Sequence, residues 1–371
     1  MKKFLFFLIF IYSKSLVAIE SIATHALIMD YLTGDILYEK NAYEKTPPAS
    51  MTKIMTSYII FDLIKNKNLS LDDEFIISKK AYKMGGSRSF VEIDSKVTVK
   101  DLLYGVIIQS GNDASVALAE NISGTEKEFA NLMNKYAIEL GMKNTNFINS
   151  SGWPHPNHYS TMYDLSVLSK NLIMNFPNLY KIFSKQEYKY NNILQYNRNL
   201  LLKYFDGADG LKTGYVKDSG YGIIGSSFKK NRRIIIAING LESSKSRNSE
   251  SQRLLNWAYR ETNNSIILEK NQILKKADVW LGSKSTVNLV SKEKIIKTLN
   301  SEQSENVKII LRYNNPLEAP IKKGDTLGVI KIIIPNMETF ETPIVSNENI
   351  KKTNILFRPF EAIRYLLFGN I

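Results

Sequence analysis

The spacing of apolar and polar residues changes twice along the chain. Residues 24–40 alternate around Thr33-Gly34-Asp35, which predicts a hairpin of two strands. Apolar residues then recur at helical spacing, which predicts helices from near Ser50 and at 102–108, 114–121, 126–140 and 161–173. Thr98-Val99-Lys100-Asp101 predicts a cap that leads into 102–108, and Ser160-Thr161 predicts a cap for the helix that runs through Ile173. From Asp209 the period returns toward two, which predicts strands at 210–216, 221–228 and 232–241 and a last helix at 249–262. This order predicts an α+β domain, an antiparallel sheet flanked by helices, over residues 19–262.

Beyond residue 262 the pattern consists of short β-like runs. They lie at 266–268, 279–281, 287–290, 307–313, 327–334 and 339–345. The shift predicts a domain boundary near residue 263 and a smaller, all-β, sandwich-like second domain over residues 263–345.

The first 18 residues have the three-part form of a secretory signal peptide. Met1-Lys2-Lys3 precedes the apolar run from Phe4 to Tyr12, and Leu16-Val17-Ala18 supplies small residues for cleavage after Ala18. The apolar run is short for a membrane span, so removal is favoured over retention as an anchor. The mature protein is therefore expected outside the cytoplasm.

The last segment, residues 346–371, predicts an amphipathic helix. Its apolar residues recur at helical spacing, and its basic residues supply positive charge: Phe360, Ile363, Leu366 and Leu367, with Lys351, Lys352, Arg358 and Arg364. The segment is too short and too charged to cross a bilayer, which favours a helix lying in the membrane interface. The alternative is a terminal helix docked on its own protein.

Composition narrows the partners and the chemistry. The formal charge of +13 falls to about +10 without residues 1–18, and such a basic protein favours an anionic partner, whether nucleic acid, lipid surface or acidic wall polymer. The absence of cysteine excludes thiol nucleophiles and disulfides. His155 and His158 lie in a Pro-containing stretch that predicts an exposed loop, and with no third ligand evident we expect no metal site.

Three short motifs carry the candidate chemistry: Ser50-Met51-Thr52-Lys53, Ser110-Gly111-Asn112 and Lys212-Thr213-Gly214. Taken singly they are consistent with a helix cap beside a solvated lysine, a turn, and a strand ending at a glycine. Taken together, the first begins a helix, the second lies in a break between two helices and the third lies on a strand. This motif set is typical of class A β-lactamases and penicillin-binding proteins.

The spacing of the first motif suits nucleophilic catalysis. Residues three apart on a helix share a face, so Lys53 can reach Ser50. A serine hydroxyl needs a base, and an amine serves as one only when it is neutral, a state that burial and the charge of Lys212 would favour. Backbone N–H groups at the start of a helix would stabilise negative charge on a substrate carbonyl.

The other motifs would complete such a site. Ser110 could pass a proton to a leaving amine, and the Asn112 amide could hold both a substrate peptide and Lys53. Lys212 and Thr213 could bind a free carboxylate, while Gly214 would let a substrate strand approach the sheet edge. An enzyme that removes the last residue of a peptide needs these groups.

The sequence resembles the low-molecular-mass penicillin-binding proteins of the D-alanyl-D-alanine carboxypeptidase family, the S11 serine peptidases. The stretches that carry the resemblance are Pro48-Ala49-Ser50-Met51-Thr52-Lys53, Gln109-Ser110-Gly111-Asn112-Asp113-Ala114 and Asp209-Gly210-Leu211-Lys212-Thr213-Gly214. The resemblance implies a penicillin-binding/β-lactamase-like transpeptidase fold, with catalytic Ser50, Lys53, Ser110 and Asn112 and substrate-binding Lys212, Thr213, Gly214 and Tyr215.

The resemblance also implies a reaction. Ser50 would form an acyl-enzyme with the penultimate D-alanine of a peptidoglycan pentapeptide stem, release the terminal D-alanine, and be freed by water. Penicillins and other β-lactams would acylate the same serine, and the oxyanion hole would be the N–H groups of Ser50 and Tyr215. No cofactor and no nucleic acid are implied, and the enzyme would lie on the periplasmic face of the cytoplasmic membrane, held there by the C-terminal helix.

Two further features bear on this reading. Tyr215 stands where the best-known members have histidine, a departure that bears on substrate positioning and deacylation. Arg198 and Arg247 are candidate helpers in carboxylate binding.

Four other functions compete with this interpretation, and three of them involve the same motifs. A β-lactamase is disfavoured because residues 145–186 contain no glutamate to activate water. A peptidoglycan endopeptidase and a non-catalytic wall-binding or penicillin-sensing protein remain as alternatives. A Ser/His/Asp hydrolase is disfavoured because no Gly-x-Ser-x-Gly elbow is present.

Overall fold

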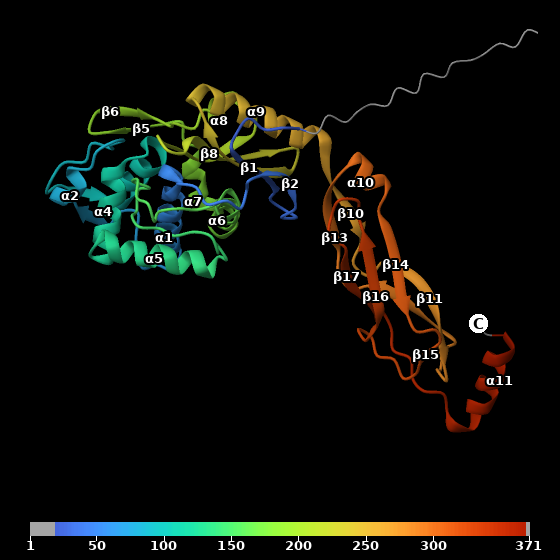
Figure 1. The fold of residues 1–371 in the computed structure, drawn as a ribbon. Coiled ribbons are helices and arrows are strands. Elements are labelled where there is room, and N and C mark those ends of the chain that lie inside the picture. Colours follow the sequence, from blue (N-terminus) through green and yellow to red (C-terminus); the bar gives the residue numbers. More distant parts are fainter. Residues whose placement is uncertain (1–18, 369–371) are drawn as a thin grey trace, which may run out of the picture.

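The computed structural model describes residues 19–368 and shows two globular parts in an elongated arrangement, with the last helix at the far end (Figure 1). The predicted signal peptide, residues 1–18, lies outside the described residues. Within the described part, none of the helices has the length and apolar character needed to cross a membrane.

The first part is built on a five-stranded antiparallel sheet with the order β2-β1-β9-β8-β7. Its strands are β1 (His25–Asp30), β2 (Ile36–Lys40), β7 (Ala208–Val216), β8 (Gly220–Lys229) and β9 (Arg232–Leu241). The sheet is apolar on both faces. Along β9, Ile234, Ile236 and Ile238 belong to one hydrophobic core, and Ile235 and Ala237 belong to the other. This alternation explains why the sheet lies between two layers of helices.

Helices cover both faces of this sheet (Figure 1). One core is completed mainly by α8 (Leu201–Tyr204) and α9 (Ser244–Glu261). The larger core contains most of the remaining helices: α1 (Lys53–Lys65), α2 (Lys79–Tyr82), α3 (Val99–Tyr104), α4 (Asn112–Ser123), α5 (Glu126–Glu139), α6 (Met162–Asn175) and α7 (Pro177–Tyr180). Two small two-stranded sheets accompany these helices: β3 (Glu74–Ile76) with β4 (Lys96–Thr98), and the hairpin of β5 (Glu187–Tyr190) with β6 (Ile193–Tyr196). The predicted α+β architecture is therefore confirmed.

Local signals account for most of the predicted elements and for two differences. The side chains of Thr98 and Thr161 cap α3 and α6 as predicted. The last helix of the first part, α9, starts five residues earlier than predicted, because Ser243 and Ser246 form a reciprocal capping box. The β5–β6 hairpin was not predicted; its turn has Asn191 and Asn192 at positive φ, a conformation that asparagine tolerates.

The second part consists mainly of strands around its own core. A six-stranded sheet has the order β14-β16-β17-β12-β11-β15, and a separate pair joins β10 to β13. The elements are β10 (Thr262–Leu268), β11 (Ile273–Trp280), β12 (Thr286–Ser291), β13 (Ile295–Asn300), α10 (Ser301–Glu305), β14 (Lys308–Tyr313), β15 (Leu317–Glu318), β16 (Thr326–Ile333) and β17 (Phe340–Ser346). Leu268 and Leu299 of the pair share a core with Ile330 and Ile332 of the larger sheet, so the two sheets pack together.

Polar contacts join the two parts beside the β1–β2 hairpin. The carboxylate of Asp35 lies 2.9 Å from the Lys297 ammonium and accepts the Thr298 N–H at 2.8 Å. The hydroxyls of Thr33 and Thr298 are 2.7 Å apart. The two parts also follow one another without a linker, because α9 ends at Glu261 and β10 begins at the next residue. Together, this direct connection and the polar contacts fix the direction in which the second part extends from the first.

Candidate active site

Ser50 lies in η1 (Ala49–Thr52), a single 3-10 turn that leads directly into α1. The caps of these two elements are Pro48 and Thr52, so Ser50 is not a helix cap. Strand β7 packs closely against this turn, because a Cβ at Gly214 would lie only 3.0 Å from the Pro48 carbonyl oxygen. The lack of a side chain at Gly214 therefore lets the third motif lie against the first, in addition to the room for a substrate strand that the sequence predicts.

Lys53 begins α1 and is completely buried. Its Nζ lies 3.0 Å from Ser50 Oγ, and it donates to Asn112 Oδ1 at 2.7 Å and to the Ser151 carbonyl oxygen at 2.6 Å. A neutral amine has two hydrogens and one lone pair. Because the two other partners can only accept, they take both hydrogens, and the lone pair is left for the Ser50 hydroxyl.

Burial favours this neutral form. Desolvation lowers the pKa of Lys53 to about 7, with the positive charge of Arg198 assisting and Asp113 and Glu126 opposing. Arg198 thus adds a positive charge near Lys53 that sequence reasoning did not name. A substantial fraction of the Lys53 side chains is then neutral near pH 7.

The second motif follows η2 (Gly105–Gln109), one turn of π-helix. Ser110 has φ of 67°, a left-handed conformation that is unusual for serine and common at functional sites. Gly111 packs against Ser89, since a Cβ there would lie 1.9 Å from the Ser89 hydroxyl. Asn112 is the first residue of α4, and its Nδ2 donates to the Gly85 carbonyl at 2.9 Å, which aims its Oδ1 at Lys53.

The third motif lies on the edge strand β7. Thr213, Gly214 and Tyr215 line the pocket, whereas the Lys212 side chain is buried behind it and donates to the Thr213 carbonyl at 3.2 Å. Desolvation, helped by the charge of Lys53 and of two arginines, lowers the pKa of Lys212 well below its usual value. Tyr215 is half exposed and packs on Tyr221 with ring centroids 4.2 Å apart.

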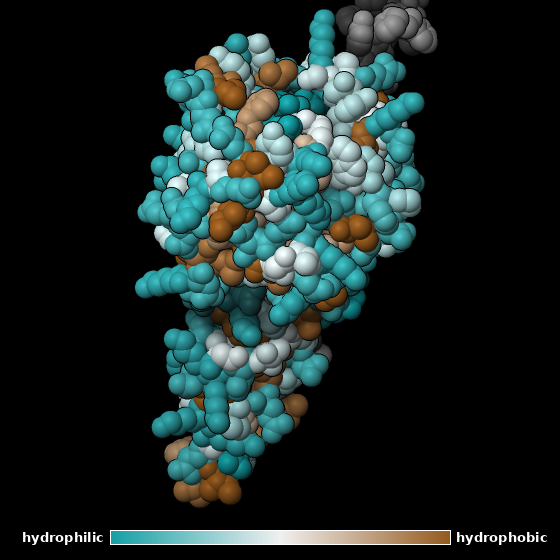
Figure 2. Space-filling model, turned by 90° about the vertical axis from the view of Figure 1, so that its left-hand side faces the viewer, coloured by the Kyte–Doolittle hydropathy of each residue, from teal (hydrophilic) through white to brown (hydrophobic). Residues whose placement is uncertain are grey.

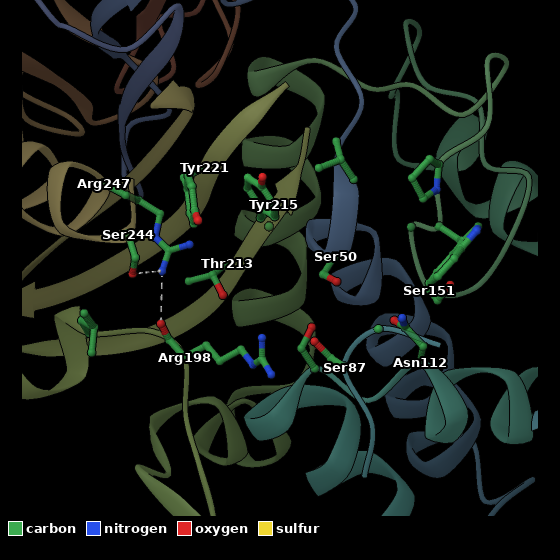
Figure 3. A pocket seen from close by; sticks show the side chains of 18 residues that line it. Ser50, Ser87, Asn112, Ser151, Arg198, Thr213, Tyr215, Tyr221, Ser244 and Arg247 are labelled. Atoms are coloured by element: carbon green, nitrogen blue, oxygen red, sulfur yellow. Dashed lines mark hydrogen bonds between the residues drawn. The ribbon is translucent and has the colours of Figure 1, made fainter. Parts of the chain in front are cut away.

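The pocket that joins the motifs has a volume of about 630 Å³ and a cationic end. Figure 3 shows Arg198, Arg247 and Thr213 to one side of Ser50, and Asn112 and Ser151 to the other. Arg247 is held by the Ser244 hydroxyl, at 3.1 Å, and desolvation lowers its pKa to about 10. Among the described residues that line the pocket none is acidic, so an anion entering this end meets only positive charge.

Sequence reasoning missed part of the pocket and misplaced one histidine. Ser151, Gly152 and Trp153 form a wall, and no local pattern marks a backbone carbonyl such as that of Ser151 as a partner of Lys53. The prediction of an exposed loop holds for His155 but is wrong for His158, which is 3% exposed.

Hydrogen bonds explain the burial of His158. Its Nδ1 accepts from the Ile148 N–H, so its Nε2 carries the proton and faces the Thr52 hydroxyl at 2.9 Å. Desolvation lowers its pKa to about 4. In the part of the chain that the structure describes, no group of histidines and carboxylates could hold a metal ion.

The fold and the pocket define a class of protein. A Ser-x-x-Lys turn, a Ser-x-Asn break and a Lys-Thr-Gly edge strand around one pocket, in an antiparallel sheet between helices, are characteristic of serine acyl-transferring enzymes of the penicillin-recognising type. The chain belongs to the D-alanyl-D-alanine carboxypeptidase family, whose sequences it matches over residues 13–242. Residues 263–352 match the C-terminal domain of penicillin-binding protein 5.

Relatives span nearly the whole chain. The D-alanyl-D-alanine carboxypeptidase DacF of Bacillus subtilis is 36% identical over 90% of this chain and 87% of its own, and DacC of Escherichia coli is 35% identical over 91% and 86%. The solved structure of DacD from Francisella tularensis superposes with a TM-score of 0.79 at 33% identity, covering 90% of this chain and 95% of that one. Penicillin-binding protein 5 from Haemophilus influenzae gives 0.78 at 32% identity, covering 91% and 100%.

Proposed function

We propose that this protein is a serine D-alanyl-D-alanine carboxypeptidase that removes the terminal D-alanine from peptidoglycan stem peptides through an acyl-enzyme on Ser50. One observation carries the proposal: both hydrogens of the neutral Lys53 amine have acceptors, so its lone pair faces the Ser50 hydroxyl. The relatives in the family carry the same activity in their names.

Acylation follows from this geometry. Lys53 Nζ takes the proton of Ser50 as Oγ attacks the carbonyl carbon of the penultimate D-alanine. Backbone N–H groups of Ser50 and Tyr215 would stabilise the oxyanion. The C–N bond then breaks as Ser110 relays the proton from Lys53 to the departing D-alanine amine, which returns Lys53 to its neutral form, and Asn112 holds the remaining peptide. Water later attacks the ester and frees Ser50.

The cationic end of the pocket accounts for removal of a terminal residue. A free α-carboxylate can bind the Thr213 hydroxyl and the guanidinium groups of Arg198 and Arg247. Its negative charge would also raise the pKa of Lys212 behind the strand and favour a charged amine there. A cross-link formed through a side-chain amine that has no neighbouring carboxylate cannot make this contact. The pocket therefore favours carboxypeptidase activity over cleavage of such cross-links.

β-Lactams would acylate Ser50 in the same way, and the acyl-enzyme would persist. A fast β-lactamase of class A uses a glutamate to activate water. The described lining of this pocket holds no carboxylate. Slow deacylation of a penicilloyl enzyme is therefore expected, and many fast turnovers of benzylpenicillin would contradict it.

We also propose that the protein is exported and attaches peripherally to the membrane through α11 (Arg358–Phe368) and the turn before it. Tyr365 packs edge-on against Trp280, with centroids 5.4 Å apart. At 3.6 residues per turn, Phe360, Ile363 and Leu367 lie on the side of the helix opposite Tyr365.

These apolar residues are exposed to solvent. Ile355, Leu356 and Phe357 before the helix are exposed as well. Figure 2 shows apolar side chains at the lower tip of the molecule, the end at which Figure 1 places this segment. The helix thus docks by one face and presents the opposite, apolar face outward, with Lys351, Lys352 and Arg358 nearby to favour anionic lipid.

The nucleophile can be tested by mass spectrometry after incubation with benzylpenicillin. The mature protein should gain one penicilloyl adduct on the peptide that contains Ser50, and it should release D-alanine from a pentapeptide. The Ser50→Ala variant should lose both. Ser291→Ala is the matched control, because Ser291 is also followed three residues later by a lysine but lies in β12. An adduct that persists in Ser50→Ala refutes the assignment.

A further inference from the structure

A second cavity adjoins the active-site pocket across Trp153. It has a volume of about 570 Å³ and is lined by Lys80, Lys83, Met84, Gly85, Glu126, Asn149 and Trp153. Trp153 also lines the first pocket, as does Gly86, the neighbour of Gly85. A molecule that extends from the first pocket past Trp153 therefore enters the second.

The boundary between the cavities is made of a flat ring and a glycine pair. A Cβ at Gly85 would lie 3.4 Å from the Trp153 ring, and one at Gly86 would lie 3.3 Å from that ring and 2.9 Å from Asn112 Nδ2. The glycines thus allow the ring to lie against the backbone that Asn112 holds. Trp153 remains 45% exposed, so part of its ring is open to a ligand.

The charges of the second cavity favour an anion. The Glu126 carboxylate lies 2.7 Å from the Lys80 ammonium, and its other oxygen accepts from the backbone N–H and the hydroxyl of Ser150, at 3.2 and 3.0 Å. This carboxylate is already bound and nearly buried. Lys83, directly after α2, brings a second positive charge to the lining. A carboxylate would be attracted by this excess positive charge, and an ammonium would be repelled.

The direction of the substrate connects the two sites. If the terminal carboxylate binds Arg198 and Arg247, the chain preceding the scissile bond passes Ser50 toward Asn112 and Ser151, on the opposite side in Figure 3. Trp153 lies two residues beyond Ser151. The residue that precedes the two D-alanines can therefore lay its side chain across Trp153.

We propose that the Lys80–Lys83–Trp153 cavity is a specificity subsite for a carboxylate-bearing side chain on the residue that precedes D-alanyl-D-alanine. The Trp153 ring packs against the aliphatic part of that side chain, and Lys83 attracts its carboxylate. This inference rests on the proposed carboxypeptidase function and deepens it by naming a second point of substrate recognition.

The test uses two tripeptides that differ only in charge: Nα-acetyl-α-aminoadipyl-D-alanyl-D-alanine and its side-chain carboxamide. The wild-type enzyme should release D-alanine from the carboxylate with a kcat/KM about fivefold higher than from the amide, and added salt should reduce this ratio. Lys83→Ala should bring the ratio close to one, and Lys83→Glu should invert it. Lys79→Ala, at the start of the short helix that Lys83 follows but outside the cavity lining, should keep the wild-type ratio.

The outcomes separate this inference from the function on which it rests. Equal kcat/KM for the two peptides in the wild type, or an unchanged preference in Lys83→Glu, overturns the subsite, while D-alanine release from both peptides still upholds the carboxypeptidase. No release from either peptide by the wild type overturns the proposed function, and the subsite with it.

Discussion

The active-site pocket and the tip of the second domain depart from ordinary burial in opposite directions. Behind the pocket wall, Lys53 and Lys212 place amines in the interior. At the tip, Phe360, Ile363 and Leu367 leave between 56% and 79% of their surface exposed. Proteins ordinarily do the reverse, because burying a charge and exposing an apolar side chain both cost free energy. The comparison teaches that desolvation lowers the pKa of an amine in one region, which suits it to the proposed role of base, and that the other region exposes the apolar surface on which the proposed membrane attachment rests.

The largest expected effect comes from removing the buried amine. Lys53→Met keeps similar bulk without a proton acceptor, so acylation by benzylpenicillin should slow by about 10³-fold. Lys65→Met, at the exposed end of the same helix, is the matched control and should acylate at the wild-type rate. Both variants should retain the wild-type circular dichroism spectrum. Rapid acylation of a folded Lys53→Met variant would show that another group acts as the base.

The next effect concerns the protonation state of that amine. In the proposed mechanism the neutral amine is the base, and burial lowers the pKa of Lys53 to about 7. Lowering the pH protonates the base, so the acylation rate should fall tenfold per unit below about pH 7 and stay level above it. The pKa of His158 is lowered to about 4, so this histidine would not produce an inflection near 7. A rate independent of pH from about 5 to 9 would contradict this role of Lys53.

The smallest effect concerns the tip. Burying an isoleucine in an apolar phase is worth about 1.5–3 kcal/mol, so Ile363→Ser should weaken binding to anionic lipid vesicles about tenfold or more. Ile138→Ser is the matched control, because Ile138 is equally apolar and 79% exposed but lies on α5 of the first domain. Co-sedimentation with vesicles measures both. Equal losses, or no loss in either variant, would remove α11 as the attachment site, and D-alanine release should be the same in all three proteins.

Local signals made much of the fold predictable. The Thr98 and Thr161 caps and the period-two strands of the sheet depend on neighbours within a few residues, and the structure confirms them. His158 shows where such reasoning fails. Its stretch of prolines and polar residues is typical of an exposed loop, but its ring is buried by a contact with Thr52, 106 residues away. The sequence around a residue does not record which distant element covers it.

The sequence by itself determined the reactive pair, because the three-residue spacing of Ser50 and Lys53 on one turn places a hydroxyl and an amine on the same face. Only the tertiary structure decided that the amine can act as a base. Its two hydrogens are taken by Asn112 and Ser151, which lie 59 and 98 residues away, and its pKa is lowered by burial among elements from the whole first domain. The reason is physical: spacing is a property of the local backbone, whereas desolvation depends on every segment that packs around the group.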